Sequence, residues 1–119
     1  MLIDGTSFSE VFLNLSGDPR LNRHQQSAAY RIGSWQQDQE EFARQFRAAE
    51  DARDEAAMAE LDELGAIHLA ARPFRFGPPI PGGRLFLCEG NEFHVYHSHD
   101  PDTMDVRLDG PTDAKPRRR

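Results

Sequence analysis

The sequence predicts an α+β protein with two or three N-terminal helices packed on a C-terminal antiparallel sheet of three to four strands. Apolar residues recur at helical spacing in the first two thirds of the 119-residue chain and alternate in the last third. A Pro- and Gly-rich connection, residues 72–83, separates the two patterns and cannot form a helix. We therefore expect one domain over residues 1–111, with a helical part at 1–65 and a β part at 66–111.

The first helix is predicted between Ser7 and Gly17. Ser7 and Glu10 form a capping-box pattern, in which the two side chains satisfy free backbone N–H groups at the helix start. Four apolar residues at positions i, i+3, i+4 and i+7 then define one buried face: Phe8, Val11, Phe12 and Leu15. Gly17 stands where a helix commonly ends.

Two further helices are predicted before the connection. One starts at Asp18-Pro19, because Asp is a good N-cap and Pro is tolerated at the first helical position, and it ends at Gly33. The other, residues 35–64, contains neither Pro nor Gly and is expected to stop at Gly65. Without a break it would be about 45 Å long, more than a small domain can cover. We therefore expect a break near its alanine-rich middle or a projecting arm.

Extended segments fill the last third of the chain. Alternation predicts a short strand at 67–71 and another at 104–108. Between them, segments 84–89 and 92–98 are predicted to pair as a hairpin around Gly90-Asn91. One hairpin face carries Phe86, Cys88, Phe93 and Val95, and the other carries Leu85, Leu87, His94 and Tyr96.

Charge and composition exclude several classes of protein. The chain has 20 acidic and 14 basic residues, a net charge of −6, so we expect no direct nucleic-acid binding. The single cysteine excludes an internal disulfide framework. No apolar run approaches the ~20 residues of a membrane span and no secretion signal opens the chain, so a cytoplasmic protein without membrane contact is expected. The basic tail, residues 112–119, is expected to be disordered.

Acidic residues concentrate on the longest predicted helix. Residues 36–64 hold ten acids and three arginines, a net charge of −7. A solvated outer face would explain this pattern, and so would a surface that meets a basic protein partner. The second interpretation assigns partner binding to four clustered acids and two aromatic anchors: Glu50, Asp51, Asp54, Glu55, Trp35 and Phe42.

These observations favour a small non-enzymatic protein-binding module without a cofactor. It would inhibit or regulate a larger, nucleic-acid-handling assembly by steric and electrostatic occlusion, as antagonists encoded by phages or mobile elements do. An alternative is an assembly subunit whose alanine-rich helix packs against its own copy in a homodimer.

Histidines near the end of the predicted hairpin support a competing hypothesis, an enzyme. Side chains alternate along a strand, so only His97 and His99 converge. With a third ligand from elsewhere, for example Asp100, Asp105 or His68, they would form a metal site. A second form of this hypothesis is an acid–base site, as in RNA-cleaving toxins, that uses His94 or His97 with Tyr96, Arg84 or Arg107. The surrounding aspartates argue against an RNA substrate.

Overall fold

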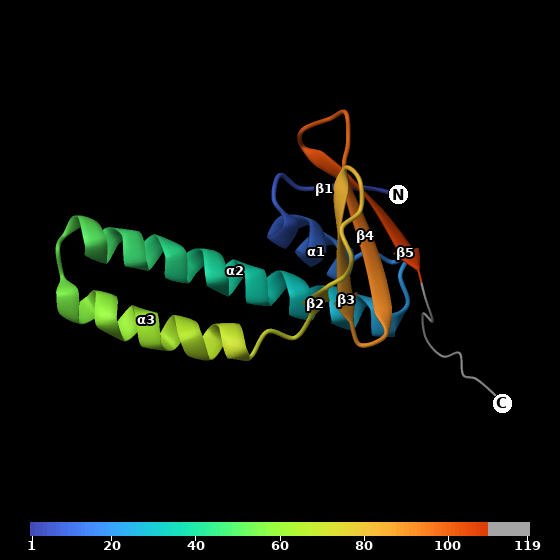
Figure 1. Ribbon diagram of the computed structural model, residues 1–119. Coiled ribbons are helices and arrows are strands. Elements are labelled where there is room, and N and C mark those ends of the chain that lie inside the picture. The colour runs from blue at the N-terminus through green and yellow to red at the C-terminus, as the bar shows by residue number, and fades with distance from the viewer. Residues whose placement is uncertain (110–119) are drawn as a thin grey trace. The chain divides into compact units, whose positions relative to one another are not determined.

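The computed structural model describes residues 1–109 and divides them into two compact units (Figure 1). One unit combines Met1–Ser34 with the part of the chain from Pro73 onward, and the other is Trp35–Arg72. The predicted α+β class is confirmed, with three helices and a five-stranded antiparallel sheet. The expected single domain over 1–111 stays a prediction. The predicted disordered tail, 112–119, lies outside the described residues.

The sheet belongs to the first unit and has the strand order β1-β5-β4-β3-β2. Its strands are β1 Leu2–Asp4, β2 Arg75–Phe76, β3 Gly83–Cys88, β4 Asn91–His97 and β5 Thr103–Asp109. Strands β3, β4 and β5 correspond to the predicted hairpin and final strand. Strands β1 and β2 were not predicted, because three and two residues are too few to show an alternating pattern.

The turn between β3 and β4 lies one residue earlier than predicted. Cys88 pairs with Asn91, so the turn residues are Glu89 and Gly90, with φ of 52° and 83°. Positive φ at both positions is the mark of a type I′ turn. Arg31 forms an ion pair with Glu89 at 2.8 Å, and the Nε2 atom of His24 lies 3.2 Å from the Glu89 carbonyl oxygen. These contacts hold the turn against α2, the helix Arg23–Asp51.

The two faces of the hairpin nevertheless match the prediction. The pairing shifts by an even number of positions, which leaves every side chain on its expected face. The predicted inner residues Phe86, Cys88, Phe93 and Val95 are at most 3% exposed. Helix α1, Phe8–Ser16, covers this face, and the Phe12 ring contacts Phe86 and Phe93 at centroid distances of 4.8 and 5.3 Å.

Helix α1 begins as the capping pattern predicts. The hydroxyl of Ser7 accepts a hydrogen bond from the Glu10 N–H at 3.3 Å. The Glu10 carboxylate accepts from the Thr6 hydroxyl at 2.7 Å and from the Thr6 backbone N–H at 2.8 Å, and these bonds, with a weaker contribution from the Ser7 backbone N–H, lower the pKa of the carboxyl. Three of the four predicted core residues of α1 are fully buried: Val11, Phe12 and Leu15.

The predicted start of the second helix at Asp18-Pro19 is wrong. Asp18 instead pairs with the Arg20 guanidinium at 2.6 Å, and this hydrogen bond lowers the pKa of the Asp18 carboxyl to about 2. Helix α2 begins at Arg23, because Asn22 and Gln25 form the stronger cap. The Asn22 side chain accepts from the Gln25 N–H at 2.8 Å, and the Gln25 side chain accepts from the Asn22 N–H at 3.0 Å.

The predicted helix end at Gly33 is also wrong, since α2 continues to Asp51. Gly33 is buried where α1 and α2 pack closely. A Cβ atom there would lie 2.9 Å from the backbone nitrogen of Leu13. The glycine therefore permits a close helix–helix contact and does not terminate the helix.

The predicted break in the acidic helix is confirmed. Helix α2 ends at Asp51, and α3, Glu55–Ala70, follows after a short turn in which Arg53 has φ of 56°. The predicted stop at Gly65 and the predicted strand at 67–71 are both wrong, because α3 runs through them to Ala70. A helix cannot continue far past this point, since Pro73 lacks a backbone N–H.

Apolar and other residues alternate at 67–71 because two large apolar side chains of α3 are exposed, and not because the segment is a strand. His68 turns toward α2 and is half-buried, whereas Ile67 and Leu69 are 61% and 54% exposed on α3. None of the helices within residues 1–109 is long and apolar enough to cross a bilayer.

Replacing each of two helical glycines with alanine should change the stability of the protein in opposite directions. Gly33→Ala gains about 1 kcal/mol of helix propensity, but the clash with Leu13 costs about 1–3 kcal/mol, so we expect net destabilisation. Gly65→Ala meets no atom within 4 Å and should stabilise the protein by about 1 kcal/mol. Urea unfolding of both variants measures these changes, and stabilisation by Gly33→Ala would contradict the close contact.

Candidate functional site

The second unit, Trp35–Arg72, contains a helical hairpin, residues 35–70, made of the second part of α2 and all of α3. Its two helices are joined near their open end by Trp35 and His68. The Trp35 indole N–H donates to the His68 carbonyl oxygen at 2.9 Å, and His68 Nε2 lies 3.0 Å from the Trp35 carbonyl oxygen. The two rings stack with centroids 4.5 Å apart and an interplanar angle of 6°.

The structure places both predicted aromatic anchors at the contact between α2 and α3, which we call the seam. Trp35 is half-buried against His68, and the half-buried Phe42 ring lies 5.2 Å from the His68 ring. Both therefore hold α2 to α3. Phe42 also reaches the surface, because it lines two hollows on the helical hairpin.

The four predicted acidic residues do come together. Glu50, Asp51, Asp54 and Glu55 surround the turn that joins α2 to α3, and all four are exposed. Asp54 also has a structural role, because its carboxylate accepts from the Ala57 N–H at 3.1 Å and caps α3. Within residues 1–109 the carboxylates of the other three form no hydrogen bond or ion pair. We call these four residues the acidic tip.

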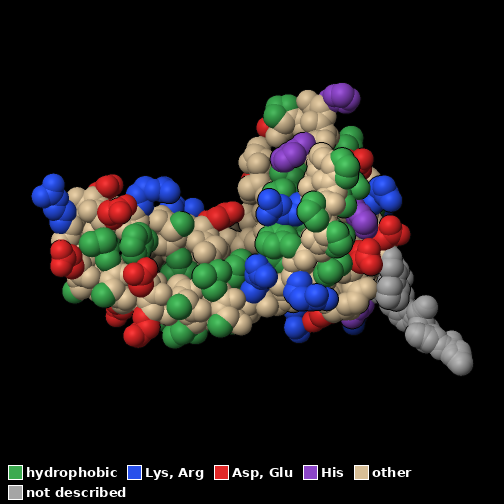
Figure 2. All heavy atoms as spheres, viewed as in Figure 1, with side chains coloured by type: hydrophobic (Ala, Val, Ile, Leu, Met, Phe, Trp, Pro, Cys, Tyr) green, Lys and Arg blue, Asp and Glu red, His purple; other side chains and the backbone are tan. Residues whose placement is uncertain are grey.

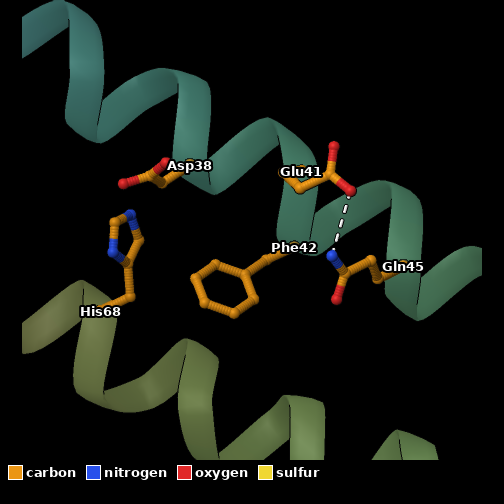
Figure 3. Close-up of a pocket in the computed structure, with 5 residues that line it drawn as sticks. All are labelled: Asp38, Glu41, Phe42, Gln45 and His68. Atoms are coloured by element: carbon orange, nitrogen blue, oxygen red, sulfur yellow. Dashed lines mark hydrogen bonds between the residues drawn. The ribbon is translucent and has the colours of Figure 1, made fainter.

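A hollow of about 250 Å³ lies on one side of the seam (Figure 3). Asp38, Glu41, Phe42, Gln45 and His68 line it. Figure 3 shows the Asp38 carboxylate extending toward the His68 ring. Glu41 accepts a hydrogen bond from the Gln45 amide at 3.0 Å and a further one from Arg44, and both lower the pKa of its carboxyl.

An apolar groove of about 290 Å³ lies on the other side of the seam, because its α2 residues are on the opposite side of Phe42 around the helix. Both helices line it, with Gln39, Phe42, Ala43, Phe46, Leu61, Asp62, Gly65, Ala66 and Leu69. The sequence pattern did not indicate this groove, because residues 67–71 were predicted to form a strand. Continuing the helical spacing from Leu61 through Gly65 to Leu69 would have found its α3 side.

Helix α3 buries none of its residues. Three of its large apolar side chains are well exposed: Leu64 at 43%, Ile67 at 61% and Leu69 at 54%. Figure 2 shows apolar and acidic side chains together on the visible face of the helical hairpin. Leu69 lines the apolar groove, whereas Leu64 and Ile67 lie on another side of α3.

The two histidines proposed for an acid–base site lie on opposite faces of the sheet, and only His97 shares a face with Arg84. His94 lies on the outer face of the sheet, where its Nε2 atom is 3.4 Å from Glu92 and 3.6 Å from Asp109. Arg84 and His97 belong to the opposite face, since β3 and β4 side chains alternate. Arg84 there stacks over the Phe76 ring at 5.0 Å.

The alternative metal ligands are not gathered either. His97 ends β4 beside Phe8, whereas His99 and Asp100 follow it in a bend. The Asp100 carboxylate accepts from the Asp102 N–H at 2.9 Å and so stabilises this bend. Within the part of the chain that the structure describes, no group of three His, Cys, Asp or Glu side chains is placed to hold a metal ion.

Cys88 is a poor nucleophile at neutral pH. Its side chain is 3% exposed, and this burial, with a smaller contribution from the Glu89 charge, raises the pKa of the thiol to about 11. The thiol therefore stays protonated and packs as a small apolar group.

Comparison with protein-family models, with curated proteins and with solved structures found no match.

Proposed function

We propose that this protein is a non-enzymatic protein-binding module whose helical hairpin binds a basic surface of a larger protein. By covering that surface, it inhibits or regulates the partner. The acidic tip carries the proposal, because its carboxylates are exposed and three of them have no partner within residues 1–109.

Charge supports this proposal. Residues 35–72 contain ten acidic residues and four arginines, so the second unit has a net charge of −6. Clustered carboxylates raise the association rate with a cationic protein and disfavour acidic ones. Spaced carboxylates can also occupy a groove that normally holds phosphates, so an antagonist of a nucleic-acid-handling assembly, encoded by a phage or mobile element, fits this surface.

Reversing two charges of the acidic tip tests the proposal. We expect Glu50→Lys with Asp51→Lys to reduce capture of the native partner from host lysate at least tenfold, as quantified by mass spectrometry. Asp54 is left unchanged because it caps α3. The matched control is Asp4→Lys with Asp102→Lys, two exposed acids of the first unit whose side chains have no partner within residues 1–109.

The control should capture the same partner as the unmodified protein. Equal capture by both double variants, each folded by circular dichroism, would refute the electrostatic contribution of the acidic tip.

A further inference from the structure

The apolar groove has the lining that a partner helix would need. Phe42 and Phe46 of α2 and Leu61 and Leu69 of α3 contribute large apolar side chains, whereas the small residues between them leave space. A Cβ atom added at Gly65 would meet nothing within 4 Å. We propose that this groove binds an amphipathic helix of the partner whose apolar residues are flanked by Lys or Arg. This inference rests on the proposed function.

The length of the groove matches two turns of helix. Leu61 and Leu69 are eight residues apart, which corresponds to about 12 Å along α3. Apolar residues at positions i, i+4 and i+7 of a bound helix span about 10.5 Å. Such a helix would place one apolar stripe against the aromatic rings of α2 and the leucines of α3.

The negative charge of the helical hairpin favours a cationic helix as the occupant of the groove. Asp62 lies in the groove lining, and the helical hairpin around it has ten acids and three arginines, a net charge of −7. A bound helix with Lys or Arg beside its apolar stripe would place those cations near carboxylates. A second copy of the chain would instead bring two hairpins with a net charge of −7 each together, and their repulsion opposes self-association through this face.

The probe is a 14-residue peptide of two heptads, with Leu at the a and d positions and Lys elsewhere. Fluorescence anisotropy of the labelled peptide measures its affinity for the full chain. We expect an otherwise identical peptide with Glu in place of Lys to bind at least tenfold more weakly. Equal binding of the two peptides would overturn the choice of a cationic occupant.

One substitution on α2 tests the groove directly. Ala43 is exposed and lines the groove, so Ala43→Arg obstructs it and repels a cationic helix. Ala48→Arg is the matched control, because it adds the same charge to an exposed position of the same helix outside the groove lining. We expect at least a tenfold loss of Lys/Leu peptide binding for Ala43→Arg and less than a twofold change for Ala48→Arg. Equal losses would overturn the groove as the binding site.

Native-partner capture separates this inference from the proposed function. Loss of capture by both Ala43→Arg and the Glu50→Lys, Asp51→Lys variant supports the two together. Loss of capture by the acidic-tip variant alone would overturn the groove as a binding site and leave the proposed function standing. Unchanged capture by the acidic-tip variant would count against the proposed function. Sedimentation tests self-association. If the unmodified protein forms a dimer and Ala43→Arg does not, the occupant of the groove is a second copy and the inference is overturned.

Discussion

Replacing Phe86 with alanine is expected to lower the free energy of unfolding by about 3–5 kcal/mol. The Phe86 ring is fully buried and contacts four aromatic rings at centroid distances of 4.8–5.6 Å: Phe8, Phe12, Phe74 and Phe76. Removing it leaves a cavity between α1 and the sheet. Since small domains have only about 5–15 kcal/mol of stability, the variant should be largely unfolded at elevated temperature.

Phe76→Ala is the comparison for this measurement. Phe76 shares the aromatic cluster but is 42% exposed, so its loss should cost clearly less than that of Phe86. Urea unfolding followed by circular dichroism measures both variants. Equal destabilisation would show that the core is not centred on Phe86.

Replacing Trp35 with alanine should separate α3 from α2. The change removes the ring stacked on His68 and the hydrogen bond to the His68 carbonyl oxygen, together worth about 2–4 kcal/mol. The other contacts between α3 and α2, including that of Phe42, involve α3 side chains that are at most half-buried, because α3 has no fully buried residue. Hydrogen exchange should show at least tenfold faster exchange of α3 amides, with amides of the sheet unchanged.

Trp35→Phe retains an aromatic ring but lacks the N–H donor, so it isolates the hydrogen bond. We expect its effect on α3 exchange to correspond to about 1 kcal/mol. Unchanged exchange of α3 in the alanine variant would show that the seam between the two helices does not depend on Trp35.

Capping residues and apolar spacing predicted the elements in which every apolar residue of the pattern packs on the same side. The capping residue Ser7 and the apolar spacing through Leu15 located α1, and alternation located β3, β4 and β5. The acidic tip was also predictable, because a break in a long helix places residues on either side of the turn close together. In each case local pattern and tertiary packing agree.

The errors arose where a residue type that usually marks a helix end or start is used differently in its surroundings. Gly33 signals a helix end in isolation, yet it lies mid-helix because Leu13 needs the space. Asp18-Pro19 resembles a helix start, yet Asn22 and Gln25 form the cap. The groove was missed for a related reason, since exposed Ile67 and Leu69 gave an alternating pattern within a helix.

The turn between β3 and β4 shows why optimising a segment by itself can weaken a protein. Left-handed backbone favours asparagine or glycine, and a glutamate at position 89 is a costly choice for the turn alone. Glu89 nevertheless contributes the carboxylate that binds Arg31. An engineer who replaced it with asparagine would improve the backbone conformation and lose a charged link to α2. The least favourable residue of this loop is thus the one that connects two elements 58 positions apart in the sequence, Arg31 and Glu89.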